Sequence, residues 1–351
     1  MTRPLDLGIF LPNAKGGAIM ATGSPPQYFP SWELNRKNAL IAEGAGFDFL
    51  LSMVKWRGFG GETNHWDYSL ESFTLMAACA AVTSRIQLYA SVAIPTVHPG
   101  VIAKMVATID DISQGRFGLN IVSGWNKMEY AQMGLWQGDD YFARRYEYAA
   151  EYLEVLQRLW TEDRVTHHGA FFALDDCKSY PKPSRRIPLI CAGQSDRGIA
   201  FTSRHADFGF LGGQDDSLED LGRLNARLQT SAQGFGREVG AYVLLTVIAE
   251  ETDEQAQAKR DHFIATSDRE AMAEWARVAG MDFSRATYKD LAVQTFMAIP
   301  YVAGSYQSVA DYLDGLAENG LAGVCFIFPD YETDLQRLID RVLPLMKHRR
   351  A

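Results

Sequence analysis

Short apolar stretches alternate with longer amphipathic stretches along almost the whole chain. The short stretches are rich in Leu, Ile, Val and Phe and end at proline, glycine or small polar residues, which is typical of buried parallel strands. The longer stretches repeat apolar residues three or four positions apart, as on one face of a helix. This pattern predicts strands that begin near residues 5, 47, 86, 117, 188, 208, 241 and 324.

Helices are expected between most of these strands. They span residues 32–43, 70–84, 98–113, 141–159, 196–205, 219–232, 308–318 and 333–347. Eight strand–helix units predict an α/β fold of the (β/α)8 TIM-barrel class, formed as a single domain over residues 1–351. A doubly wound open sheet is the alternative, but no Gly-x-Gly-x-x-Gly follows the first strand.

Two segments depart from the alternation. Residues 160–185 are expected to form an irregular excursion. Residues 250–304 have helical propensity but include Gly280, Pro300 and Gly304, which favours an insertion packed on or over the barrel. Because this insertion follows a barrel strand, we expect it to act as a lid on the active-site side.

Asn120 lies inside the apolar strand that begins at Phe117. A buried amide must find hydrogen-bond partners or cost about 1–3 kcal/mol. Either neighbouring groups satisfy Asn120 or a ligand does, and the strand alone leaves both interpretations open.

Further polar residues fall at or just beyond the ends of predicted strands, where a TIM barrel carries its active site. They are Lys55, Ser91, Asn120, Ser123, Ser195 and Asp330. The set is rich in hydrogen-bond donors, and the chain has no His-x-x-x-His, no paired catalytic Glu and no Gly-x-Ser-x-Gly. This composition favours a site that holds a reactive cofactor over one that performs hydrolysis itself.

Gly193-Gln194-Ser195 stands at a strand-to-helix junction. It is compatible with a phosphate cradle at a helix N-terminus, although the stretch alone favours an ordinary N-cap. The helix from Tyr141 carries Arg144 and Arg145 in its first turns, where acidic residues are usual. A nearby anionic ligand or a salt bridge to Asp139 or Asp140 would each explain those arginines.

Charge and cysteine usage narrow the function classes. With 34 Lys and Arg against 43 Asp and Glu, the formal net charge is −9, which makes nucleic acid an unlikely partner. No signal-peptide pattern and no apolar run of membrane-spanning length is present, so we expect a cytoplasmic protein without a membrane partner. Four widely spaced cysteines predict neither a disulfide framework nor a metal site.

Several colinear segments resemble the bacterial luciferase-like flavin monooxygenases, and within them the branch that oxidises pyrimidines. The segments are Glu33-Leu34-Asn35, Leu51-Ser52-Met53, residues 57–61 (RGFGG), residues 70–77 (LESFTLMA), residues 81–87 (AVTSRIQ), residues 138–142 (GDDYF) and residues 191–196 (CAGQSD). The likeness covers roughly the first 210 residues and resumes near Gly304.

The resemblance implies a TIM barrel that binds reduced FMN and O2. Flavin-contacting positions in that family correspond here to Val54, Lys55, Asn120, Glu129, Arg145, Tyr146 and Ser195. Arg145, Tyr146 and Ser195 would hold the FMN phosphate. Asn120 and Ser91, with Leu51 lining the pocket, match the catalytic place where oxygen meets flavin N5.

The reaction that the resemblance implies is oxidative ring opening of uracil- or thymine-like pyrimidines, with cleavage of an amide C–N bond through a flavin N5-peroxide. A separate NAD(P)H-flavin reductase would supply FMNH2, and a homo-oligomer, dimer or tetramer, is expected. Ser91 stands where the pyrimidine enzymes have Thr, and residues 211–303 match poorly. Another amide, a heterocycle, a sulfone or an alkanesulfonate therefore stays open as substrate.

Two other functions are compatible with the same barrel. One is an F420-dependent oxidoreductase that transfers hydride. The other is a non-catalytic flavin-binding protein, which would have no need of Ser91 and Asn120 at an oxygen pocket.

Overall fold

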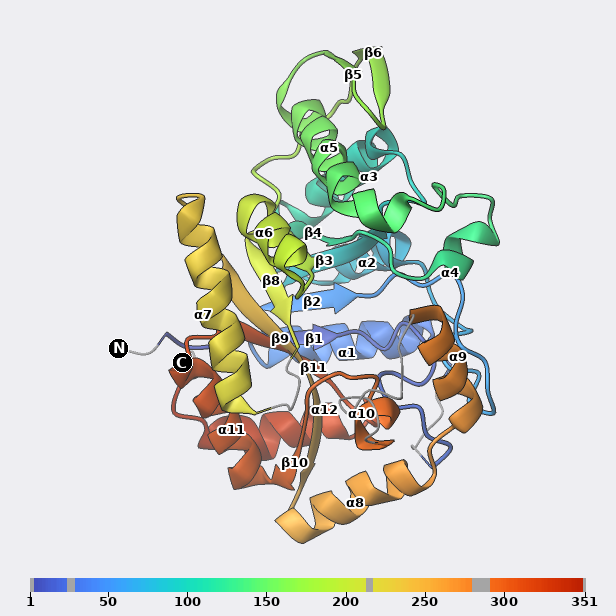
Figure 1. The fold of residues 1–351 in the computed structure, drawn as a ribbon. Coiled ribbons are helices and arrows are strands. Elements are labelled where there is room, and N and C mark those ends of the chain that lie inside the picture. Colours follow the sequence, from blue (N-terminus) through green and yellow to red (C-terminus); the bar gives the residue numbers. More distant parts are fainter. Residues whose placement is uncertain (1–2, 24–28, 213–216, 280–290, 350–351) are drawn as a thin grey trace.

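A computed structural model describes residues 3–23, 29–212, 217–279 and 291–349. Within these ranges, eight parallel strands close into a barrel (Figure 1). They are β1 (Asp6–Phe10), β2 (Phe49–Ser52), β3 (Gln87–Ala93), β4 (Phe117–Val122), β7 (Leu189–Ala192), β8 (Phe208–Leu211), β9 (Gly240–Glu250) and β11 (Gly323–Ile327). β9 pairs with both β8 and β11, which closes the sheet and confirms the predicted TIM barrel.

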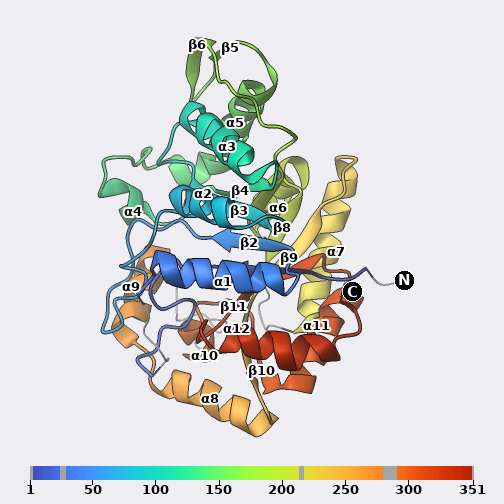
Figure 2. The same cartoon turned by 180° about the vertical axis from the view of Figure 1, so that it is seen from behind.

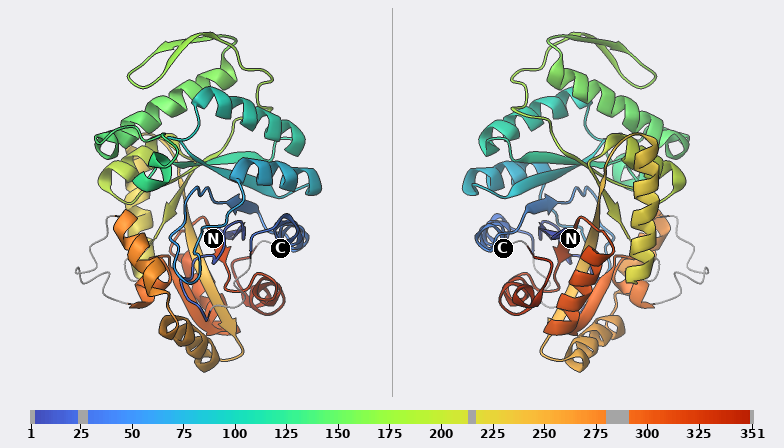
Figure 3. Two further views of the ribbon diagram at one scale, coloured as in Figure 1. Left: turned by 90° about the vertical axis from the view of Figure 1, so that its right-hand side faces the viewer. Right: turned by 90° about the vertical axis from the view of Figure 1, so that its left-hand side faces the viewer.

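Helices surround the barrel, as the views from behind and from both sides show (Figures 2 and 3). They are α1 (Trp32–Gly44), α2 (Ser72–Val82), α3 (Pro99–Ser113), α4 (Lys127–Ala131), α5 (Tyr141–Thr161), α6 (Asp196–His205), α7 (Leu218–Gly234), α11 (Tyr306–Glu318) and α12 (Asp334–Arg337). Side chains cap several of them: Ser31 begins α1, Glu71 begins α2 and Ser195 begins α6. Each cap accepts a backbone N–H that the first helical turn leaves unpaired.

The barrel interior is filled by aromatic rings. Phe49 stacks on Tyr242 with ring centroids 4.9 Å apart, and Tyr89 packs edge-on against Phe49. Gly8 and Gly118 make room for these rings, because a Cβ on Gly8 would lie 2.1 Å from Phe49 and one on Gly118 would lie 2.4 Å from Tyr89.

Side chains alternate along a strand, so residues two positions beyond an inward-facing residue also face inward. Leu51 follows Phe49, Ser91 follows Tyr89 and Asn120 follows Gly118 in this way. The register pairs Ser91 directly with Asn120 across β3 and β4. The barrel therefore presents Leu51, Ser91 and Asn120 together near the carboxyl ends of its strands.

Three predictions of local structure were wrong. Residues 160–185 include an antiparallel hairpin of β5 (Val165–His168) and β6 (Ala173–Cys177), which projects beyond α5 (Figure 1). Its charged, exposed residues hid the strand pattern. Within 250–304, β10 (Tyr301–Ser305) adds a parallel strand to β9 instead of continuing a helix. The expected last helix is α-helical only over α12 and continues as a π turn at Leu338–Val342 and a 3-10 turn at Leu343–Leu345.

The insertion after β9 otherwise contains α8 (Asp253–Ala265), α9 (Arg269–Ala279) and α10 (Leu291–Thr295). Gly280 lies outside the described residues. Apolar side chains of α9 pack on the loops that follow β1 and β2, in a cluster containing Met20, Phe59, Met272, Trp275 and Met297. The insertion thus contacts the loops at the carboxyl end of the barrel, while its action as a lid and the single-domain assignment stay predictions.

Candidate active site at the carboxyl end of the barrel

Asn120 and Ser91 form a hydrogen-bonded pair on adjacent strands. Asn120 is 9% exposed and Ser91 is 1% exposed. The Asn120 side-chain nitrogen, Nδ2, donates to the Ser91 hydroxyl oxygen over 2.9 Å. Among the described residues, the other side-chain atom of Asn120, Oδ1, is buried and has no partner. A neighbour therefore satisfies the nitrogen of the amide, and the oxygen has no partner among the described residues, so the ligand interpretation of Asn120 stays a prediction.

Two further serines support Ser91 from behind. The Ser91 hydroxyl donates to the backbone carbonyl of Ser52 over 2.6 Å, and the Ser91 backbone N–H donates to the Ser72 hydroxyl over 2.8 Å. The hydroxyls of Ser52 and Ser72 are themselves 2.5 Å apart. All three serines are fully or almost fully buried. The polar edge of β2 and β3 is thus held by hydrogen bonds between the end of β2, the start of α2 and the middle of β3.

Lys55 and Glu129 form a buried ion pair beside this edge. The Lys55 amine lies 2.8 Å from a Glu129 carboxylate oxygen, and the two side chains are 2% and 3% exposed. The second Glu129 oxygen accepts the backbone N–H of Trp56. Burial lowers the pKa of Lys55, and the Glu129 carboxylate opposes that shift. Asn126 caps the short helix α4 and so fixes the backbone that carries Glu129.

Aromatic rings surround the Lys55 amine. It lies 4.4 Å from the ring centroid of Trp125, 5.3 Å from that of Trp66 and 5.4 Å from that of Phe59. Cation–π attraction of this kind strengthens where the cation is desolvated. Val54 is partly buried next to Lys55. Phe59 and Trp66 belong to the loop that follows β2 and Trp125 belongs to the loop that follows β4. Their gathering was not predicted.

Backbone strain concentrates beside the aromatic rings. Trp66, Met297 and Ala298 have positive φ angles of 61°, 56° and 53°, which non-glycine residues rarely adopt. His65 precedes Trp66 and is fully buried, and its Nε2 is 3.1 Å from the sulfur of Met297. Burial lowers the pKa of His65 to about 3, so this imidazole is neutral near pH 7. Such strain is common at binding sites, where the surrounding structure holds it in place.

The predicted cradle lies at the β7–α6 junction. The Ser195 hydroxyl accepts the backbone N–H of Gly198 over 3.1 Å, so the N-cap interpretation is confirmed. The Tyr146 hydroxyl sits close to Gly193 and Gly198, since a Cβ on either glycine would lie within 2.8 Å of that oxygen. Ser195 is exposed and Tyr146 is half-buried. The junction therefore brings a tyrosine hydroxyl and a helix N-terminus together at one open place.

The two arginines at the start of α5 differ. Arg144 pairs with Asp140 and Glu147, which confirms the salt-bridge explanation for that residue. Arg145 stacks on Tyr146, 5.0 Å from the ring centroid, and no carboxylate pairs with it in the part of the chain that the structure describes. Arg145 thus remains available to an anion beside Tyr146.

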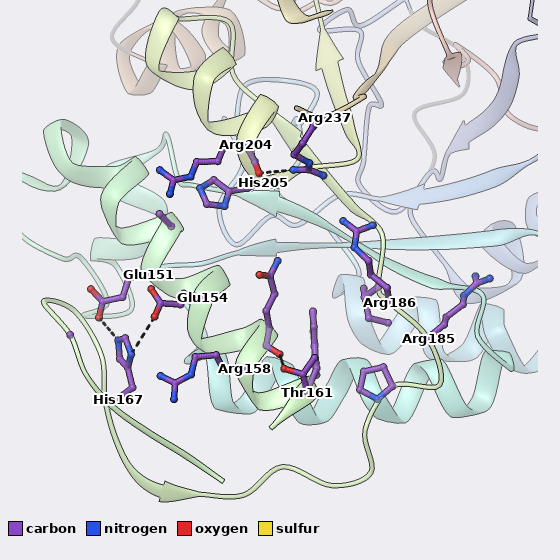
Figure 4. A pocket seen from close by; sticks show the side chains of 16 residues that line it. Glu151, Glu154, Arg158, Thr161, His167, Arg185, Arg186, Arg204, His205 and Arg237 are labelled. Atoms are coloured by element: carbon purple, nitrogen blue, oxygen red, sulfur yellow. Dashed lines mark hydrogen bonds and ion pairs between the residues drawn. The ribbon is translucent and has the colours of Figure 1, made fainter. Parts of the chain in front are cut away.

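A hollow of about 1180 Å³ lies at the other end of the barrel, between α5, α6 and the β5–β6 hairpin (Figure 4). Its charged residues include Glu151, Glu154, Arg158, His167, Arg185, Arg186, Arg204, His205 and Arg237. They come from the second half of α5, from β5, from the end of α6 and from the segments before β7 and β9. None of the predicted site residues lines this hollow.

Comparisons with known proteins identify the family of this chain. The family model described as luciferase-like monooxygenase matches residues 5–323. The chain belongs to the luciferase-like monooxygenase family and is a flavin-dependent monooxygenase by class. It is 45% identical over 354 aligned positions to the pyrimidine monooxygenase RutA of Escherichia coli O127:H6 (strain E2348/69 / EPEC), with 98% of this chain and 97% of that protein covered.

Solved structures share the fold at lower identity. Riboflavin lyase (RcaE), solved with modified FMN and riboflavin, is 22% identical with a TM-score of 0.86, covering 98% of this chain and 91% of that one. DmoA from Hyphomicrobium sulfonivorans is 21% identical with a TM-score of 0.80, covering 97% and 88%. The resemblance noted from the sequence is confirmed. No helix among the described residues is long and apolar enough to cross a membrane.

Proposed function

We propose that this chain uses reduced FMN and O2 to open the ring of a uracil- or thymine-like pyrimidine by cleaving an amide C–N bond. The observation that carries the proposal is the 45% identity to the pyrimidine monooxygenase RutA over 98% of the chain. It is supported by the half-satisfied Asn120 amide, which lies at the carboxyl end of the barrel where such enzymes act.

The residues present fit a flavin mononucleotide. A phosphate at the helix N-terminus would meet the Ser195 junction, the Tyr146 hydroxyl and Arg145, which has no carboxylate partner among the described residues. The isoalloxazine ring would contact residues at and beyond the ends of β2 and β4. These are Val54, Lys55, Asn120 and Glu129. A reduced flavin held there supplies the electrons that activate O2.

The chain's own residues orient the reactants and exclude water. Leu51 and the aromatic side chains of Phe59, Trp66 and Trp125 give the pocket apolar walls that suit a planar heterocycle. Lys55 and Glu129 keep their charges paired within those walls. Ser91 and Asn120 are the catalytic pair of this proposal, since they are hydrogen-bonded to each other on adjacent strands near the carboxyl end of the barrel.

A separate flavin reductase would supply the reduced cofactor, because the first strand–helix turn carries no dinucleotide fingerprint. We further propose a homo-oligomer and a cytoplasmic location. The four cysteines are free, which suits a reducing compartment.

Oxygen uptake with chemically reduced FMN tests the function. We expect uptake above the flavin-only rate with uracil or thymine, and incorporation of labelled oxygen into a ring-opened product. A sulfone, an alkanesulfonate or an acyclic amide that supports labelled incorporation while pyrimidines do not would replace the proposed substrate. Tight binding of F420 without FMN binding would replace the class of chemistry.

A further inference from the structure

The hollow between α5, α6 and the hairpin has its opposite charges in different places. Its acidic side chains, Glu151 and Glu154, both belong to α5. Three of its arginines come from other segments: Arg204 lies in the last turn of α6, and Arg186 and Arg237 precede β7 and β9. Figure 4 shows these arginines apart from the two glutamates. The hollow thus has an acidic side and a cationic side.

The acidic side already has its partners within the protein. Glu151 accepts the backbone N–H groups of residues 170–172 in the hairpin turn. One of its oxygens also lies 3.1 Å from Nε2 of His167. Arg158, on the same helix, pairs with Glu162 over 2.8 Å. These contacts hold the hairpin against α5 and form a wall of the hollow.

The cationic side has more arginines than carboxylates. One oxygen of Asp207 lies 2.8 Å from Arg186 and 3.6 Å from Arg237. The other oxygen accepts the backbone N–H of Leu189 over 2.8 Å. No carboxylate pairs with Arg204 within the described ranges of the chain. Three guanidinium groups therefore share one carboxylate, and three positive charges less one negative charge leave a surplus of two.

Helix stability explains only part of this cluster. Cations in the last turn of a helix interact favourably with its dipole, and Arg204 and His205 occupy that turn of α6. Arg237 comes from another segment, yet it donates to the backbone carbonyl of Arg204. Burial lowers the pKa of His205 to about 4, and Arg204 and Arg237 add to that shift. The imidazole is therefore neutral near pH 7 and can donate a hydrogen bond without adding charge.

The size and the uncharged walls of the hollow indicate the kind of ligand. Guanidinium groups bind phosphate oxygens through a planar fork of N–H donors. A phosphate monoester carries a charge of about −1.5 to −2 at pH 7, which matches the surplus. The volume of about 1180 Å³ is far more than a bare phosphate fills. Uncharged side chains also line the hollow, namely Gln157, Trp160, Thr161, Pro183 and Ile187.

We propose that this hollow binds an organic phosphate monoester, with its phosphate on Arg186, Arg204 and Arg237 and its organic part against Trp160 and Ile187. The site lies at the other end of the barrel from the proposed flavin site, and the proposal does not depend on the proposed function. Because the arginines come from three segments, a bound phosphate would connect the end of α6 to the starts of β7 and β9. Binding should therefore raise the thermal stability of the protein.

Calorimetric titration of the flavin-free protein with phenyl phosphate tests the site. Physiological salt screens attraction by exposed charges elsewhere. Arg204→Gln removes one guanidinium group and leaves both contacts of Asp207 in place, so affinity should fall about tenfold or more, as for a lost charge-assisted contact. Arg164→Gln is the control, since that arginine lies in an exposed ion pair of the hairpin and should not affect binding. Thermal denaturation without ligand checks that both variants fold.

The flavin-phosphate place proposed at Arg145 is a second possible target of the probe. The effect of Arg204→Gln should persist in an Arg145→Ala background. Binding that is lost in Arg145→Ala and unchanged in Arg204→Gln would assign the probe to the flavin place and overturn the proposal. Inorganic phosphate that binds as tightly as phenyl phosphate would show an adventitious ion only, with no organic part recognised. Absence of phenyl phosphate binding at millimolar concentration would also overturn the proposal, whether or not FMN binds.

Discussion

The strand edge of β2–β4 and the junction of β7 with α6 carry the two halves of the proposed site, and they are built in opposite ways. At the strand edge the polar groups are buried and already have protein partners. Ser52 hydrogen-bonds to Ser72 and Ser91, and Lys55 pairs with Glu129. At the junction, Ser195 is exposed and Arg145 lacks a carboxylate partner among the described residues.

Because of this difference, substitutions at the two places should affect folding stability and flavin affinity to different extents. A buried polar group that loses its partner destabilises the fold, because the remaining group has no access to water. An exposed group that loses a ligand contact returns to water at little cost. Changes at the strand edge should therefore affect folding as well as chemistry, and changes at the junction should affect mainly flavin binding.

The largest expected effect is at the Lys55–Glu129 pair. Lys55→Met leaves the Glu129 carboxylate buried without its cation, which should lower the free energy of unfolding by about 3–5 kcal/mol. Adding Glu129→Gln should restore most of that loss, since no buried charge then remains. Urea denaturation of the single and double variants measures both values.

The hairpin offers a matched control for that pair. Arg164 and Asp176 form an ion pair with both side chains more than half exposed. Arg164→Gln should leave the urea midpoint unchanged, because water replaces the lost partner. A Lys55→Met variant as stable as Arg164→Gln would contradict the view that the strand edge depends on internal pairing.

At the junction, Arg145→Ala should weaken FMN binding about ten- to hundredfold, the loss of a charge-assisted contact of about 1.5–3 kcal/mol. Arg144→Ala is the control, since that arginine is engaged by Asp140 and Glu147. Flavin fluorescence titration measures both.

Ser195 can be tested without losing its cap. Ser195→Asp keeps an acceptor for the Gly198 N–H and places a negative charge where the phosphate would lie. Thermal stability should be retained while FMN affinity falls at least as far as in Arg145→Ala. Normal FMN affinity in both variants would remove the phosphate assignment.

Lowering the pH should destabilise the folded protein through protonation of the buried His65. Its pKa is about 3 in the folded protein, against 6.5 for an ordinary histidine, so the unfolded chain takes up the proton first. The stability that the neutral imidazole contributes is complete above pH 6.5 and is lost as the pH falls toward 3. The loss is about 2 kcal/mol at pH 5.

His65→Leu should flatten the decline of stability between pH 6.5 and 5, as measured by denaturation at each pH. His168→Gln, on the exposed hairpin, should leave the decline as it is. Identical pH profiles for wild type and His65→Leu would show that the buried imidazole does not take part.

The sequence predicted the barrel because eight apolar strands and their helices leave a strong periodic pattern. Asn120 could be singled out because an amide is conspicuous in an apolar strand. The support from Ser52 and Ser72 could not be predicted, since it depends on how β2 lies against β3 and on where α2 begins. Trp125 could not be grouped with Phe59 and Trp66, because it reaches Lys55 only when the loop after β4 folds against the loop after β2. β10 was missed because a strand of five residues is too short to show a period of its own beside a segment of helical propensity.

The smallest expected effect concerns the insertion, which is hydrogen-bonded to the loop after β2. Asp268, 4% exposed, accepts the backbone N–H of Thr63 over 2.7 Å and that of Ala271 over 3.1 Å. It thereby ties the start of α9 to the loop that carries the aromatic rings. If residues 250–304 act as a lid, opening must break these bonds.

Asp268→Asn keeps one acceptor but loses the charge, so we expect the bond to Thr63 to weaken by about 0.5–1.5 kcal/mol. Proteolysis that follows a rapid opening equilibrium should then speed up about two- to tenfold. Limited proteolysis, with the first cuts located by mass spectrometry, measures this rate. FMN with substrate should slow the cuts in wild type and in Asp268→Asn alike. Asp261→Asn, whose partner is the adjacent Arg260 on α8, should cleave as wild type does. First cuts elsewhere, or no protection by FMN and substrate, would mean that the insertion is a fixed wall of the site and that only its anchoring, not its movement, serves the reaction.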